Sequence, residues 1–135
     1  MKNYEAKFNY LFRRQGGMCA IAYEYESIAM PTDLHHRCHN TKWRRKKFPL
    51  FLDSMLNLVG VSNHYHLKHP SWGKISDRRA GQYEMFLQTH PGVCEFVNNP
   101  PDVGIDMNEY INAGGIMVPD DIEIYGQLTR EGLFI

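Results

Sequence analysis

The sequence has few cysteines and none of the cysteine spacings that form structural metal sites. Cys19, Cys38 and Cys94 are its only three, they lie far apart, and no CxxC pair occurs. An odd number of widely spaced cysteines argues against the disulfide framework of a small secreted protein. We therefore expect reduced thiols and a cytoplasmic location.

Long apolar segments are also absent. No run of 18 apolar residues occurs, and no charged-then-apolar leader opens the chain, so neither a membrane span nor secretion is expected. Internal repeats and low-complexity segments are absent too. With 135 residues, 43% of them hydrophobic, the chain is predicted to form one globular domain with a modest core.

Each half of the chain is poor in charge of one sign. Residues 1–83 carry 14 Lys and Arg against 6 Asp and Glu, whereas residues 84–135 carry 1 against 9. The formal net charge of zero therefore conceals two parts suited to different partners. A basic part suits a polyanion, and nucleic acid is the commonest one.

Local patterns predict a mixture of helices and short strands. Helices are expected over 3–14, 62–68, 76–90 and 106–113, and after Pro49 as far as Leu56. Extended structure is expected over 18–29, 32–36 and 58–61, and a mixed tail over 116–135. Two apolar stripes are predicted to face the core: Tyr4, Phe8, Leu11 and Phe12, and Ala80, Tyr83, Phe86 and Leu87.

An ordered set of polar residues is present between Asp33 and His69, where six of the seven histidines fall. His35 and His36 are adjacent at the end of one predicted strand, Asn57 opens the next, and His66 follows nine residues later. Neutral imidazole binds transition metals and accepts a proton near neutral pH. Such a set suits metal-assisted hydrolysis, and a stable core does not require its order.

This order resembles that of the HNH, or ββα-metal (His-Me finger), endonucleases, over residues 13–69. The resemblance implies an α+β fold with a ββα-metal core, made of a two-stranded hairpin and a short helix, packed with additional helices. It implies that residues 1–98 form the nuclease domain with a basic insertion at 37–55. Residues 99–135 would be an acidic C-terminal extension, packed on that domain or following it. Because Ser62 and Tyr65 stand where many members have a CxxC pair, packing rather than a structural zinc is expected to stabilise this chain.

The resemblance also implies a reaction, which is hydrolysis of DNA phosphodiester bonds with one divalent ion. It carries His35 and His66 over as metal ligands, His69 as a further ligand one helical turn later, and His36 as the general base. Asn57 binds the metal in Asp-His members and braces the loop between the strands in His-His members, and two histidine ligands favour bracing here. Imidazole ligands favour Zn, Mn or Ni over Mg.

The first half of the insertion, residues 37–47, holds six cations and no acid, which predicts contact with DNA phosphates and a strong dependence on salt. The cluster and its aromatic neighbour are Arg37, Lys42, Trp43, Arg44, Arg45, Lys46 and Lys47. Trp43 suits either stacking on bases or the core.

Asp33 would orient His35 or is an ordinary acid near a turn. His39 and His64 lie outside the motif and are expected to be solvated or to support the ligands.

Two other functions fit the same sequence. A non-catalytic module would grip nucleic acid through the basic insertion, and a phage accessory protein would dock a partner through the acidic C-terminal part. Small size resembles phage- or mobile-element-borne members, which would place the protein in an infected bacterial cytoplasm. Because one site cuts one strand, a double-strand break would need a homodimer or two successive cuts.

Overall fold

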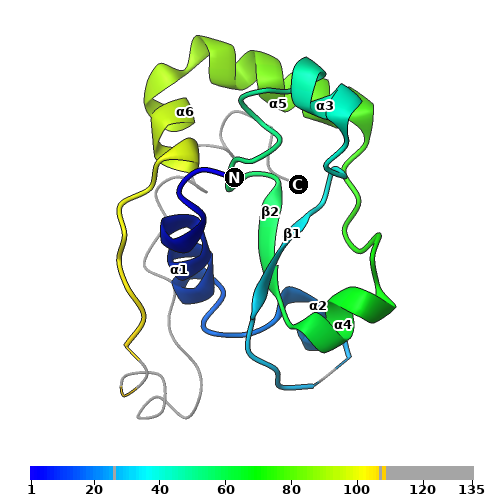
Figure 1. Ribbon diagram of the computed structural model, residues 1–135, viewed down its shortest axis with the longest axis vertical. Helices are drawn as coiled ribbons and strands as arrows, with labels where there is room; N and C mark the ends of the chain where they lie inside the picture. Colours follow the sequence, from blue (N-terminus) through cyan, green and yellow to red (C-terminus); the bar gives the residue numbers. More distant parts are fainter. Residues whose placement is uncertain (26, 107, 109–135) are drawn as a thin grey trace.

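The computed structural model describes residues 1–25, 27–106 and 108. It is a small α+β fold in which a two-stranded antiparallel sheet lies among several short helices (Figure 1). The coarse fold class predicted from the sequence is therefore confirmed. The elements, in chain order, are α1 (Tyr4–Arg14), α2 (Ala20–Glu24), β1 (Asp33–His36), α3 (Lys42–Lys47), β2 (Leu58–Val61), α4 (Asn63–Lys68), α5 (Asp77–Thr89) and α6 (Pro91–Asn98).

The sheet joins two four-residue strands, with Asp33 opposite Val61 and His36 opposite Leu58. Helices α1 and α2 pack on β2, while α4 packs on α2 and β1. In Figure 1, α2 and α4 lie at one end of the sheet, and α5 and α6 cross above the other. This arrangement brings β1 and α4, which carry the candidate histidines, into contact.

The main core lies between α1, the β1–β2 connection, α5 and α6. Its most enclosed large side chains are those of Leu11, Phe48, Phe51, Leu52 and Leu87. A second, smaller cluster joins α2 to β2 through Cys19, Ile21, Ala22 and Val61. None of the helices formed by the described residues is long and apolar enough to cross a membrane.

Several helix boundaries follow the local signals. The Ser62 and Ser76 side chains accept hydrogen bonds from Tyr65 N and Arg79 N, at 3.4 and 3.2 Å, and so cap α4 and α5. Helix α1 stops before Gly16 and Gly17, whose φ angles of 65° and 72° favour glycine. The predicted α5 stripe of Ala80, Tyr83, Phe86 and Leu87 is buried.

The expected extended segment over residues 18–29 is wrong, because Ala20–Glu24 is helix α2. The Cys19 thiol accepts a hydrogen bond from Ala22 N at 3.5 Å, as a helix cap does, and also one from Ser62 N at 3.2 Å. Burial of Ile21 and Ala22 against Val61 then stabilises helix α2. The partial alternation of aromatic residues had favoured a strand, because the contact with Val61 cannot be inferred from local sequence.

The helix expected after Pro49 is also wrong, because residues 49–57 form successive turns. Some of their backbone groups bond locally, as Leu52 N does to Phe48 O at 3.0 Å, and others bond to distant elements. Glu84 Oε1 accepts from both Leu50 N and Phe51 N at 2.9 Å, and Met55 N donates to Val97 O at 2.9 Å. With these partners supplied by α5 and α6, the segment satisfies its polar groups without a helical ladder.

One predicted stripe is only partly buried, one helix was not predicted, and two predicted elements fall largely outside the described residues. Tyr4 is 45% exposed and does not belong to the buried stripe of α1, whereas Leu11 and Phe12 are buried. Helix α6 was not expected, although Pro91 stands in its first turn, where proline is favoured. The predicted helix over 106–113 and tail over 116–135 lie outside the described residues, apart from 106 and 108.

Residues 99–106 of the acidic part lie against the domain. Asn9 Nδ2 donates to Asp102 Oδ1 at 2.9 Å, Val103 packs on the main core, and Ile105 packs on Phe12. The first residues of the extension thus contact α1.

Candidate functional site

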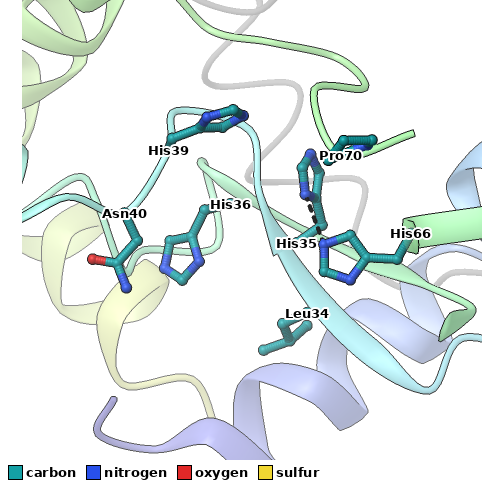
Figure 2. Close-up of a pocket in the computed structure, with 7 residues that line it drawn as sticks. All are labelled: Leu34, His35, His36, His39, Asn40, His66 and Pro70. Atoms are coloured by element: carbon teal, nitrogen blue, oxygen red, sulfur yellow. Dashed lines mark hydrogen bonds between the residues drawn. The ribbon is translucent and has the colours of Figure 1, made fainter. Parts of the chain in front are cut away.

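Four of the histidines line one cavity of about 300 Å³ beside β1. Figure 2 shows this histidine cavity, with β1 running through it. Its lining residues are Leu34, His35, His36, His39, Asn40, His66 and Pro70. Strand β1 supplies the adjacent pair and α4 supplies His66, which stands one turn into the helix capped by Ser62.

His35 and His66 point their ring nitrogens toward each other. The distance from His35 Nδ1 to His66 Nε2 is 3.3 Å. Two nitrogens that each lie 2.0–2.1 Å from a tetrahedral zinc are separated by about 3.3–3.4 Å. The spacing therefore fits two ligands of one transition-metal ion as well as it fits a hydrogen bond.

The second nitrogen of His35 is fixed by the backbone. His35 Nε2 lies 2.9 Å from Trp72 O, which can only accept, so Nε2 carries the proton and Nδ1 presents its lone pair. Burial lowers the pKa of His35, and the nearby His66, His39 and His36 rings act in the same direction, against the hydrogen bond to Trp72. A neutral ring with one nitrogen held by a carbonyl is the usual condition of a metal-binding histidine.

His66 has an acidic neighbour on its other side. Its Nδ1 lies 3.6 Å from Asp33 Oδ2, which is too far for a hydrogen bond, so the contact with His35 rather than with Asp33 decides the tautomer of His66. Asp33 thus faces His66, whereas the sequence suggested His35 as the ring that it might orient. Because His35 Nδ1 presents its lone pair, the 3.3 Å contact is a hydrogen bond from His66 Nε2, and a cation held by both rings would take the place of that proton.

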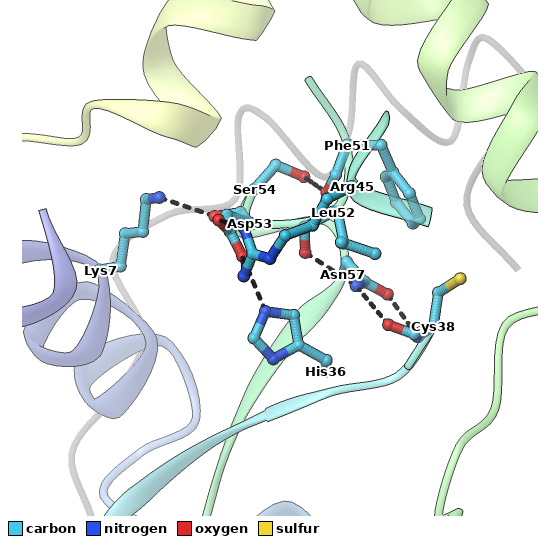
Figure 3. Close-up of polar contacts among 9 residues, drawn as sticks. All are labelled: Lys7, His36, Cys38, Arg45, Phe51, Leu52, Asp53, Ser54 and Asn57. Atoms are coloured by element: carbon cyan, nitrogen blue, oxygen red, sulfur yellow. Dashed lines mark hydrogen bonds and ion pairs between the residues drawn. The ribbon is translucent and has the colours of Figure 1, made fainter. Parts of the chain in front are cut away.

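His36 projects from the opposite side of β1, as Figure 2 shows, because neighbouring side chains on a strand alternate. His36 Nε2 lies 2.8 Å from Asp53 Oδ1, and Arg45 donates to both oxygens of Asp53 at 2.7 and 3.2 Å (Figure 3). Burial lowers the pKa of His36, although Asp53 acts in the opposite direction. A carboxylate partner places the proton on Nε2 and leaves the lone pair on Nδ1.

Asn57 is fully buried and lies directly before β2, beside the residues that follow β1. Its Oδ1 accepts from Cys38 N at 2.6 Å, and its Nδ2 donates to Cys38 O at 3.0 Å and Leu52 O at 2.9 Å (Figure 3). Its backbone oxygen accepts from Arg37 N at 2.9 Å. These bonds tie both ends of the β1–β2 connection together, which is how a bracing residue acts.

The structure does not bring His69 into the histidine cavity. His69 ends α4, its ring stacks on Tyr25 at 5.0 Å between centroids, and its Nδ1 lies 3.4 Å from the Tyr25 hydroxyl. Within residues 1–25, 27–106 and 108, no three His, Cys, Asp or Glu side chains gather closely enough to hold a metal by themselves.

The structure adds Asp53 to this region and places His39, which was expected to be solvated or to support the ligands, in the lining of the cavity. Asp53 was one acid in an apolar segment, and only the folded chain places it against His36. His39 lines the cavity with its ring 6.5 Å from that of His35, and its Nε2 is buried without a hydrogen-bond partner among the described residues. The histidine-rich composition was the only signal for His39.

The cations of the basic insertion are of two kinds, those bonded to other groups of the protein and those exposed on α3. Arg44 pairs with Asp77 at 2.7 Å, Arg45 pairs with Asp53, and Arg37 Nε donates to Gly73 O at 2.8 Å. The side chains of α3 that remain most available for an outside partner are exposed: Lys42, Trp43, Lys46 and Lys47. Trp43 is 54% exposed and has Lys47 Nζ 4.8 Å from its ring centroid, so it does not belong to the core.

Comparison of the chain with protein-family models, curated proteins and solved structures found no match.

Proposed function

We propose that this protein is a metal-dependent endonuclease of the HNH type that hydrolyses DNA phosphodiester bonds. The observation that carries the proposal is the facing pair of His35 Nδ1 and His66 Nε2 at 3.3 Å, with Trp72 O holding the far nitrogen of His35 and the Asp33 carboxylate 3.6 Å from that of His66. The antiparallel β1–β2 pair followed at once by α4 supports a ββα-metal core. A pair of histidines with only a structural role would not require a hairpin that is followed at once by a helix.

His35 and His66 would hold one divalent ion, with Zn, Mn or Ni preferred because both ligands are imidazoles. The ion would stabilise charge on the phosphate and on the leaving oxygen. Two protein ligands leave coordination positions for water and substrate, which a catalytic site requires and a structural site does not. His69, held by Tyr25, is not needed in this set.

His36 would act as the general base. Asp53 orients its ring and stabilises the imidazolium that forms, while the lone pair on Nδ1 takes a proton from water. A low pKa in the resting protein keeps His36 neutral and ready to accept near pH 7. Asn57 holds the loop that follows β1 and thereby fixes the adjacent histidine pair.

Cleavage of supercoiled plasmid with added Zn, Mn, Ni or Mg tests the proposal. We expect His36→Ala to abolish cutting while metal affinity, measured by calorimetry, stays close to that of the parent. His66→Ala should weaken both. The matched control is His64→Ala, on the same helix but outside the histidine cavity, which should change neither. Equal cutting by the parent and His36→Ala would show that the base is assigned wrongly.

The exposed lysines of α3 favour a second candidate, a nucleic-acid-binding module without catalysis. Such a module would bind DNA in a salt-dependent way and leave plasmid intact with every metal. Cutting that disappears in His36→Ala and His66→Ala excludes it.

A further inference from the structure

A second cavity, of about 510 Å³, lies where the start of the chain, α3 and the end of α6 meet. We call it the lysine cavity. Its polar lining includes three cationic side chains, one carboxylate and two amides: Lys2, Lys7, Arg45, Asp53, Asn98 and Asn99. Figure 3 shows Lys7 reaching from α1 toward Asp53 and Arg45.

Lys7 is an unusual residue for this position because it is only 2% exposed. Its Nζ donates to Asp53 O at 2.7 Å, and an ammonium has three N–H donors. A neutral carbonyl oxygen does not balance a buried charge, and burial accordingly lowers the pKa of Lys7 despite the nearby Asp53 carboxylate. An anion in the cavity would supply the missing counter-charge.

The Asp53 carboxylate does not supply that charge alone. Both of its oxygens are held by Arg45, and one is shared with His36. Together with Lys2, which is exposed, the lining therefore keeps an excess of positive charge. Ammonium and guanidinium groups around a polar cavity are typical of phosphate recognition.

Asp53 also connects this cavity to the candidate catalytic site. It lines the lysine cavity and bonds to His36, which lines the histidine cavity. Arg45 belongs to the basic helix α3, so the lysine cavity continues the surface on which nucleic acid is expected to lie.

We infer that the lysine cavity binds a second phosphate of the nucleic-acid strand, beside the phosphate that is cut at the histidine cavity. This inference rests on the proposed function and adds to it the direction in which the strand runs across the protein. Lys7 and Lys2 contact the phosphate oxygens, while Arg45 holds Asp53 and closes the wall between the two cavities.

Binding of short thymidine oligonucleotides tests this inference without cleavage. The probes carry one to five phosphodiesters, and affinity is measured in chelator, which removes metal. The parent should gain on the order of tenfold in affinity at the length where a second phosphate reaches the lysine cavity. Lys2→Ala and Lys7→Met should lose that step and keep the affinity for the shortest probe. Lys74→Ala, which removes an exposed cation outside the lining and outside α3, should retain the step.

Each outcome decides the matter. If Lys7→Met fails to fold, Lys2→Ala, at an exposed position, still reports the step. A smooth rise with length in the parent, or a step that survives in Lys2→Ala and in a folded Lys7→Met, overturns the inference. Inorganic phosphate that shifts the Lys2, Lys7 and Asn99 amide resonances as strongly as the oligonucleotides would make this a free-phosphate site, which also overturns it. Because no cutting is measured, an inactive protein that shows the step would refute the nuclease proposal alone.

Discussion

At the scale of single residues, the site depends on which atom of each polar side chain is already engaged. His35 presents Nδ1 because Trp72 O holds its Nε2, and His36 presents Nδ1 because Asp53 holds its Nε2. Asn57 does not present an atom in this way, because its side-chain amide bonds to Cys38 and Leu52. The same three polar residues of the motif therefore divide into two that can do chemistry and one that holds the loop.

Removing the Asn57 amide should destabilise the protein strongly. Asn57→Ala leaves Cys38 N, Cys38 O and Leu52 O buried without their partner, and each unpaired group costs about 1–3 kcal/mol. We expect the free energy of unfolding in urea to fall by about 3 kcal/mol or more. Asn63→Ala, at an exposed position, is the control and should change it little. A decrease below about 1 kcal/mol for Asn57→Ala would contradict the bracing role.

Asp53 should make stability depend on pH in the acid range. Burial alone would raise its pKa, but the hydrogen bonds from Arg45 and His36 outweigh burial and hold the pKa below the ordinary value of 3.8. A group with a lowered folded pKa stabilises the protein above its unfolded pKa, and this contribution is lost as the pH falls through the folded value. Urea unfolding between pH 5 and pH 2 should show a steeper loss for the parent than for Asp53→Asn. Glu24→Gln, an exposed acid-to-amide control, should follow the parent.

At the scale of secondary structure, α4 and α5 share the type of residue that caps their first turn but differ in function. Both begin at a serine that caps the helix, yet only α4 carries a candidate ligand, and only α4 packs on β1. The position of His66 relative to His35 therefore depends on the first turn of a six-residue helix, which is too short to be stable by itself.

The two serine caps provide a matched pair of variants. Ser62→Ala and Ser76→Ala should each lower the free energy of unfolding by about 1 kcal/mol, because each removes one capping bond. Only Ser62→Ala should also weaken zinc binding in calorimetry, since it loosens the turn that presents His66. Equal zinc affinities in the two variants would mean that α4 does not position a ligand.

At the scale of the whole molecule, charges of opposite sign are separated along the chain. The acids nearest to the basic helix, Asp53 and Asp77, neutralise Arg45 and Arg44, which leaves lysines as its available cations. A nucleic acid would therefore meet Lys42, Lys46 and Lys47 first. Each phosphate that a lysine neutralises releases counterions, so binding should weaken as salt rises.

Salt dependence of DNA binding measures this surface. Replacing Lys42, Lys46 and Lys47 by alanine should make the slope of log affinity against log salt shallower by about 0.9 for each phosphate that is no longer neutralised. Arg44→Ala should change the slope less, because Asp77 already neutralises that side chain. Fluorescence anisotropy of a labelled duplex in chelator, at several salt concentrations, gives the slope. An unchanged slope in the triple variant would place the DNA elsewhere.

The sequence alone determined the features that arise from contacts within a few residues. Serine caps defined the starts of α4 and α5, an apolar run defined β2, and a stripe of period 3.6 defined the buried face of α5. The order of His35, His36, Asn57 and His66 could also be recognised without coordinates, because the spacing of a motif is a property of the sequence itself.

Only the tertiary structure decided the features that depend on partners distant in sequence. Helix α2 packs Ile21 and Ala22 on Val61, and the turns over residues 49–57 bond to Glu84 and Val97 in addition to their local bonds. Asp53 reached His36, and Tyr25 took His69, through contacts that no local pattern encodes. Burial and hydrogen bonding between distant segments outweigh weak local preference in such places, which is where sequence reasoning about this protein ended.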